Sequence, residues 1–278
     1  MTDVVLNSFF PDGSKLLQWI LPGLWESVFG PDVRCSMPAA IILDTVIANP
    51  AVAASAVLGI LIGSSYSIKC MNLYFRTGKY GESYIFYGLS FAFFALMNTS
   101  AVFYHCIHPP LLYIKDIGLP IPYHAHLTHL AHVVDISSTC CSCLSFIIGR
   151  LYHIHALQKW DPRVFIMIFA AIYVVSYFGL IEMDSNTHGY STLVPFLGEL
   201  LYPGILACTV VTVPFLQWPR VKYPNLLLAF VTIALAFAMG FCELYLCRYL
   251  GSHFTAPMWA FVFCDIAFLF VADLISVK

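Results

Sequence analysis

This chain has very little charge. Of its 278 residues, 10% are charged and 60% are hydrophobic. A soluble domain of this length needs far more polar surface, which excludes an ordinary cytosolic or secreted globular protein. The 13 basic and 15 acidic residues leave a net charge of −2 that is spread thinly, which argues against nucleic-acid binding. The expected partner is instead the lipid bilayer.

The chain also lacks a recognisable cleavable signal peptide. The first apolar run, at 16–25, is short, contains a proline and is not followed by a small-residue cleavage pattern. We therefore expect the first true span to insert as a signal-anchor. Residues 1–48 are the only sizeable stretch outside the spans, and we expect them to be lumenal, with an interfacial amphipathic helix at 14–29.

A disulfide framework is not expected either, although the chain has ten cysteines. Most of them lie inside apolar segments, where cysteine is usually a small buried residue. Cys35 is outside those segments. Any bridge is expected to join it to Cys106, Cys242 or Cys247, which lie near segment ends.

Long apolar segments are what the sequence has in abundance. Each is near the ~20 residues that a helix needs to cross the hydrocarbon core. The seven segments span residues 50–68, 83–107, 128–149, 163–181, 192–216, 225–246 and 254–275. The sequence therefore predicts an all-α integral membrane protein, with a bundle of seven transmembrane helices over residues 49–278.

Lysine and arginine in the short loops predict the orientation of these helices, because cytosolic loops carry an excess of both. Nine fall on one side of the membrane: Lys69, Arg76, Lys79, Arg150, Lys159, Arg163, Arg220, Lys222 and Lys278. Four fall on the other side: Lys15, Arg34, Lys115 and Arg248. We expect the N-terminus to be lumenal or extracellular and the C-terminus to be cytosolic.

Ionisable residues at membrane depth are costly, so each is a candidate for a functional site. The candidates are His105, Asp135, Glu199, Glu243, His253 and Asp265. The predicted topology puts the first five in the lumenal half, without a lysine or arginine beside them. Carboxylates in that position need a metal, a proton or hydrogen-bond donors. The sequence thus predicts one shared polar cavity, and the alternative for each residue is a purely structural role.

The stretch HAHLTHLAHVVD brings four histidines ahead of Asp135. His132 and Asp135 form an i,i+3 pair on one helix face, so the carboxylate is placed to orient that imidazole as it would a metal ligand. The other three, His124, His126 and His129, are also consistent with the wet end of a membrane helix. A ligand role and an interfacial role both remain open.

A serine and a histidine that end the second span, an early aspartate in the third and a histidine that opens the seventh resemble a known layout. It is that of alkaline ceramidases, progestin and adipoQ receptors and Per1-type GPI-lipid remodelling proteins. In that superfamily these groups and a final His-x3-His hold zinc, whose bound water hydrolyses a lipid amide or ester. The resemblance implies His105, Asp135 and His253 as metal ligands.

Two departures set this chain apart from that layout. NTSAVFYHC places Ser100 and His105 five residues apart instead of four, which turns the histidine about 100° around the helix. Only a local π-bulge would bring it back into register. GSHFTAPMW has Pro257 where the second histidine belongs, so another group, such as His132, would have to replace it.

A second resemblance is spread over most of the chain. VVSYFGL in the fourth segment and the terminal GSHFTAPMWAFVFCDIAFLFVADL are similar to the transmembrane protein 187 family. This resemblance implies a multipass endomembrane protein of the Golgi or endoplasmic reticulum, with the plasma membrane as the alternative. It implies no chemical activity.

Three functions follow as hypotheses. The first is a non-hydrolytic protein that keeps the seven-helix scaffold and holds no cofactor. The second is a zinc-dependent lipid amide or ester hydrolase with a rearranged ligand set. The third is a seven-helix receptor, which GRLYHIH disfavours because it stands where an Asp-Arg-Tyr switch is expected. We expect the first, with a lipid as the ligand.

Overall fold

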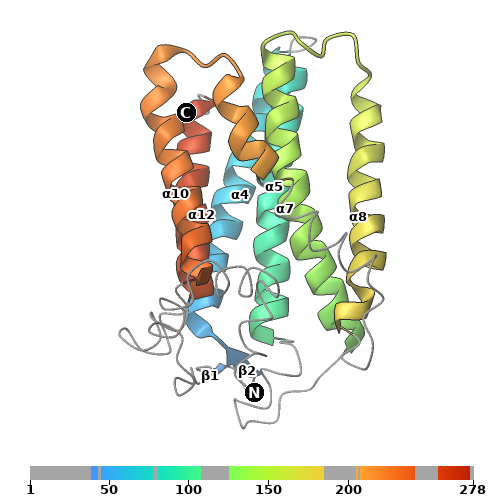
Figure 1. Cartoon of the computed structure of the whole chain (residues 1–278), viewed down its shortest axis with the longest axis vertical. Helices are drawn as coiled ribbons and strands as arrows, with labels where there is room; N and C mark the ends of the chain where they lie inside the picture. The colour runs from blue at the N-terminus through green and yellow to red at the C-terminus, as the bar shows by residue number, and fades with distance from the viewer. Residues whose placement is uncertain are drawn as a thin grey trace, which may run out of the picture.

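The computed structural model describes residues 39–42, 45–77, 81–107, 125–184, 205, 207–241 and 256–275. In these ranges the protein is mostly helical: long helices run up and down in a bundle, with a small hairpin at one end (Figure 1). Three helices are long and apolar enough to cross a membrane, over Pro50–Thr77, Glu82–Ile107 and His126–His153. A shorter apolar helix covers Pro162–Phe178. The prediction of a helical membrane protein is confirmed at this level, and the number of spans stays a prediction.

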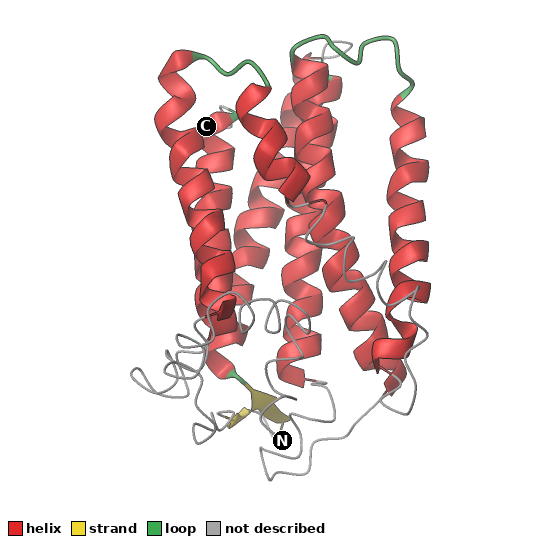
Figure 2. Cartoon of the chain, viewed as in Figure 1, coloured by secondary structure: helices red, strands yellow, loops and turns green. Residues whose placement is uncertain are grey.

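The helices follow the predicted apolar segments. They are α4 (Pro50–Thr77), α5 (Glu82–Val102), α7 (Ala125–His153), α8 (Pro162–Asp184), α10 (Tyr223–Phe241) and α12 (Ala256–Leu274) (Figure 2). Of the fifth predicted segment, residues 207–212 are helical. They run into the 3-10 turn η3 (Val213–Phe215), where the proline interrupts the α-helical pattern, and η4 (Arg220–Lys222) precedes α10.

A β-hairpin before α4 departs from the all-α prediction. Strands β1 (Ala39–Ile42) and β2 (Thr45–Ala48) are antiparallel, with Ala39 opposite Ala48 and Ile42 opposite Thr45. AAII and TVIA are joined by only two residues and carry β-branched side chains, which suits a tight hairpin. The predicted interfacial helix at 14–29 lies outside the residues that the structure describes.

Helix α5 lies at the centre of the described bundle, between α4 and α7. Four of its aromatic side chains are almost fully buried: Phe86, Tyr87, Phe91 and Phe94. Ser90 and Ser142 fasten α5 to α7, because each hydroxyl donates to the other residue's carbonyl at 2.9 and 2.8 Å. Small polar residues that bond between helices are typical of membrane bundles.

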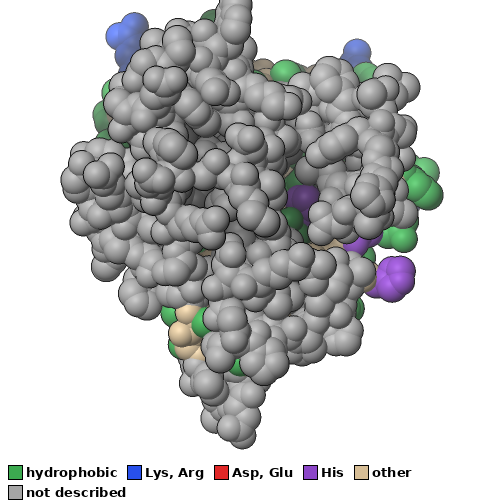
Figure 3. All heavy atoms as spheres, turned by 60° about the horizontal axis from the view of Figure 1, so that its bottom comes forward, with side chains coloured by type: hydrophobic (Ala, Val, Ile, Leu, Met, Phe, Trp, Pro, Cys, Tyr) green, Lys and Arg blue, Asp and Glu red, His purple; other side chains and the backbone are tan. Residues whose placement is uncertain are grey.

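The two ends of the bundle differ in charge. All seven lysines and arginines that the structure describes lie toward the end where α4 finishes and α5 starts, here called the basic end: Lys69, Arg76, Arg150, Lys159, Arg163, Arg220 and Lys222. The opposite end, here called the histidine end, carries the hairpin, the end of α5 and the start of α7. Figure 3 brings it forward and shows histidine side chains there, while the described basic side chains that are visible lie at the far margin. The seven described lysines and arginines, which the loop charges assign to one side of the membrane, thus all lie at one end of the bundle.

Candidate functional site

The last turn of α5 opens into a π-helix, η2 (Phe103–Ile107). A π turn closes its hydrogen bonds one residue further along the chain than an α turn, so residues beyond it shift in register by one position. The spacing of five between Ser100 and His105 then works as a spacing of four. The register defect that we inferred from the sequence is therefore corrected by the local backbone.

The hairpin end of the chain supports this π-helix. Cys106, within it, is a free and buried thiol that donates to the carbonyl of Asn49 at 3.7 Å, where β2 turns into α4. Cys106, Val52 and Met258 form a buried cluster, with Ile47 of β2 packed against it. The π turn is thus held by contacts from three other elements, and Cys106 is not a disulfide partner of Cys35.

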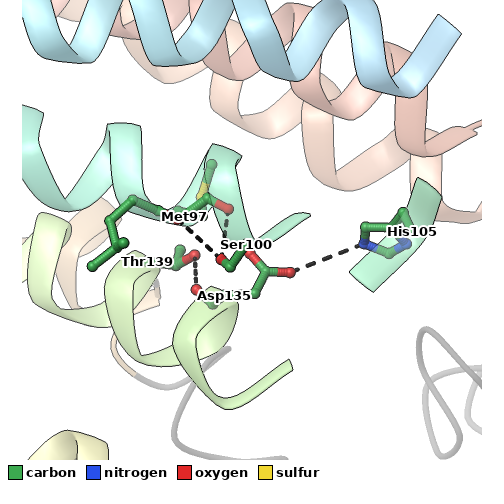
Figure 4. A network of polar contacts seen from close by, with 6 residues as sticks. Met97, Ser100, His105, Asp135 and Thr139 are labelled. Atoms are coloured by element: carbon green, nitrogen blue, oxygen red, sulfur yellow. Dashed lines mark hydrogen bonds and ion pairs between the residues drawn. The ribbon is translucent and has the colours of Figure 1, made fainter. Parts of the chain in front are cut away.

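The π-helix directs His105 toward Asp135 of α7. Their Nε2 and Oδ2 atoms are 4.0 Å apart, and the side chains are 10% and 19% exposed. Figure 4 shows the carboxyl of Asp135 directed from α7 toward the His105 ring. A charged imidazole would form an ion pair with the carboxylate, and a neutral one leaves a donor and an acceptor close together. The π-helix and α7 thus bring these two ionisable side chains together at one end of the bundle.

His132 lies beside this pair, so three ionisable side chains come together here. Its ring stacks on Tyr104 of the π-helix, with centroids 4.5 Å apart and planes 18° apart. It lies close enough to both His105 and Asp135 to interact with them electrostatically. Tyr104 lies edge-on to His105 at 4.9 Å, and Phe261 of α12 approaches His105 at 6.2 Å. Aromatic rings therefore wall the polar group on two sides.

The nearby hydroxyl groups do not bind the carboxylate. Ser100 donates to the main-chain carbonyls of Leu96 and Met97 at 3.1 and 2.8 Å, within its own helix. Thr139 donates to the main-chain carbonyl of Asp135 at 2.9 Å. The resemblance assigns Ser100 to a zinc site, but its hydroxyl donates to main-chain carbonyls of its own helix in this structure.

His105, His132 and Asp135 are not arranged as a metal site in this structure. Catalytic zinc takes three protein ligands and keeps one open position. In the part of the chain that the structure describes, no three His, Cys, Asp or Glu side chains are arranged to hold a metal ion. Pro257 lies in the first turn of α12 and offers no donor. His253, Glu199 and Glu243 fall outside the described residues.

Other predicted candidates lie apart from the pair. His129 is buried against Tyr177 of α8, with ring centroids 5.1 Å apart, whereas His126 is exposed on the first turn of α7. His124 is outside the described residues. Asp265 is buried in α12, and no hydrogen bond or ion pair within the described ranges links it to His105 or Asp135.

The sequence reading missed two contributors to this region. The sequence analysis assigns no role to Tyr104, whose ring covers His132. Phe261 had no recognised role, although it faces His105. Aromatic residues beside a buried histidine are the signal that would have indicated both.

No protein-family model, curated protein or solved structure matches this chain. The two resemblances drawn from its motifs therefore stay predictions.

Proposed function

We propose that this chain is a multipass membrane protein with a seven-helix bundle that binds a lipid and does not hydrolyse it. The contact between His105 and Asp135, buried near one end of the bundle, is the observation that carries the proposal. Ionisable residues in that position are rare and usually serve a ligand or a proton pathway. Without any rearrangement, the His105–Asp135 pair offers a ligand both a hydrogen-bond donor and an acceptor.

The surroundings of the pair favour a lipid over a water-soluble ligand. Large apolar side chains are exposed next to it: Phe103 in the π-helix is 45% exposed, and Leu127 and Leu130 on α7 are 49% and 51% exposed. A ligand with a polar head and apolar chains would place its head against His105 and Asp135. Its chains would then lie along the exposed apolar side chains at the same end of the bundle.

Two features argue against hydrolysis. Pro257 stands where the resemblance requires a histidine, and the hydroxyl of Ser100 is committed to its own helix. A hydrolytic zinc needs three protein ligands and a positioned water. The described histidines and acids do not supply that set.

A zinc-dependent lipid amide or ester hydrolase is the second candidate, and the π-helix favours it. That turn restores His105 to the register expected of a ligand. With His105 and Asp135 adjacent and His132 beside them, His253 would complete a rearranged set. The two candidates therefore differ in metal content and turnover.

We expect the purified full-length protein to carry far less than one zinc per chain and to release no product from ceramide or ester substrates. Elemental analysis and product release measure both. Lipid binding is expected to raise its melting temperature. His105→Ala should remove most of that rise because it deletes the imidazole, and Asp135→Asn because it removes the negative charge. His126→Ala, at an exposed position of α7, is the matched control and should keep it. Stoichiometric zinc that disappears in His105→Ala and His132→Ala, together with hydrolysis, would establish the second candidate instead.

The proposal includes an orientation and a location. The basic end is cytosolic, because lysine and arginine concentrate on the cytosolic side of membrane proteins. The histidine end and the polar pair then face the lumen of the Golgi or endoplasmic reticulum. Cysteines introduced as Phe75→Cys and Val221→Cys, at exposed positions of the basic end, should react with an impermeant label only from the cytosolic side. Labelling from the lumenal side alone would show the inverse topology. Leu127→Cys, at the histidine end, is the matched position and should react oppositely.

A further inference from the structure

Two buried side chains in the middle of the bundle have oxygen atoms without a hydrogen-bond donor. Asp265 on α12 is 2% exposed, and Asn98 on α5 is fully buried. Within the described ranges, both carboxylate oxygens of Asp265 and the Oδ1 atom of Asn98 have no hydrogen-bond partner. The amide nitrogen of Asn98 donates to the Phe94 carbonyl at 2.9 Å, which leaves Oδ1 as the free atom. Buried acceptors of this kind are uncommon in native proteins, and a bound ion is one way in which they are satisfied.

An aromatic contact places Asn98 and Asp265 at the same level. Phe94 of α5 stacks on Phe268 of α12, with ring centroids 3.7 Å apart. The two helices run in opposite directions (Figure 1). Asn98 follows Phe94 by about 6 Å along α5, and Asp265 precedes Phe268 by about 4.5 Å along α12, both toward the histidine end. The two side chains thus lie within about 1.5 Å of each other in depth.

A second contact fixes the face of α12 that carries Asp265. Phe261, Asp265 and Phe268 are spaced i, i+4 and i+7, so they share one face of the helix. Phe268 meets Phe94, and Phe261 meets His105 at the end of α5. Asp265 therefore faces α5 between these two contacts. On α5, Asn98 likewise lies between Phe94 and His105.

Helix α4 closes this region from a third side. A Cβ atom added at Gly59 would lie 2.5 Å from both Cγ and Oδ1 of Asn98, so the amide rests directly on the bare backbone of α4. This contact fixes the position of the Asn98 side chain against α4. The oxygens are held by three packed helices, in contrast to flexible loops.

We propose that Asp265 and Asn98 form a buried binding site for a monovalent cation, with sodium as the probe that fits. Carboxylate and amide oxygens are the ligands that hard cations prefer. One carboxylate neutralises one positive charge, whereas a divalent ion would leave an uncompensated charge in an apolar interior. No described lysine or arginine is near enough to serve, since Lys69, the nearest along α4, is about 15 Å from Gly59. The site is separate from the His105–Asp135 pair and does not rest on the proposed function.

The melting temperature of the full-length protein in detergent tests this proposal directly. We compare NaCl with choline chloride at equal ionic strength, because choline is too large for the site. Saturating sodium is expected to raise the melting temperature by roughly 3 °C, since a ligand that binds only the folded state stabilises it. An equal melting temperature in the two salts would overturn the proposal without any variant.

Variants locate the effect. Asp265→Asn should abolish the difference between the two salts, and Asn98→Ala should move it to at least tenfold higher sodium. Asp161→Asn, an exposed acid before α8, is the matched control and should keep the full response. A sodium response that persists in Asp265→Asn would place the cation elsewhere. An Asp265→Asn protein that is as stable as the parent, with no salt effect in either, would show that a proton satisfies these oxygens.

Discussion

Arg150→Met is expected to lower the free energy of unfolding by about 4 kcal/mol, because Arg150 is 5% exposed and holds a loop at the basic end. Its Nε atom donates to the Leu216 carbonyl at 2.9 Å, and its guanidinium also donates to the carbonyl of Gln217. The guanidinium carbon lies 4.2 Å from the ring centroid of Trp218. Each charged hydrogen bond contributes roughly 1.5–3 kcal/mol, and the ring contact up to about 2 kcal/mol when it is desolvated.

Unfolding of the detergent-solubilised protein by denaturant measures the effect. Arg150→Lys keeps the charge but loses the planar fork, so an intermediate loss is expected. Arg163→Met, at an exposed position of α8, is the control and should change stability by less than about 0.5 kcal/mol. A loss in Arg150→Met no larger than in this control would mean that the loop is held by other contacts.

Gly63→Val is expected to destabilise the protein by about 3 kcal/mol, because it forces α4 away from α5. A Cβ atom at this position would lie 2.7 Å from the Phe91 carbonyl oxygen and 2.8 Å from the Ala95 nitrogen. Both are main-chain atoms, so no side chain is able to move aside. The same unfolding measurement reports the loss.

Gly88 offers the matched control on the same helix interface. A Cβ atom there would come no closer than 3.4 Å to its neighbours, Cys70 and Met71, which is close to ordinary contact. Gly88→Ala should therefore be nearly neutral, or stabilising by up to about 1 kcal/mol through helix propensity. If Gly63→Val and Gly88→Ala behave alike, the close approach of α4 and α5 is not what limits packing.

Apolar segment length predicted the helices well, because burial in lipid or protein leaves the backbone few alternatives to a helix. The segment expected at 83–107 matches Glu82–Ile107, and the one at 254–275 matches α12 closely. The hairpin was missed because its strands have only four residues each, too few to give a periodic signal. The seven-span count and the orientation rest on residues that the structure only partly describes.

The family resemblance and a shared depth both place His105 near Asp135, whereas the sequence names a π turn only as the condition for the right register. Hydrogen-bond pattern within one turn is decided by what packs on it, here Cys106 against Asn49, and that contact joins residues far apart in sequence. The sequence analysis assigns no role to Asn98. Its unpaired oxygen became visible when α4 and α12 were placed around it.

The packing of α5 between α4 and α7 also bears on the order in which the protein assembles during synthesis. His105 and Asp135 belong to segments that leave the ribosome before residue 154, and α12 later adds Met258 against the π turn and Phe261 against His105. Asp265 arrives only with α12, whose Phe268 must dock on Phe94 to bring it into place. Until then Asn98 has no carboxylate opposite it. The side chains of the polar pair are thus present early in the nascent chain, whereas their surroundings and the oxygen site are complete only when α12 docks.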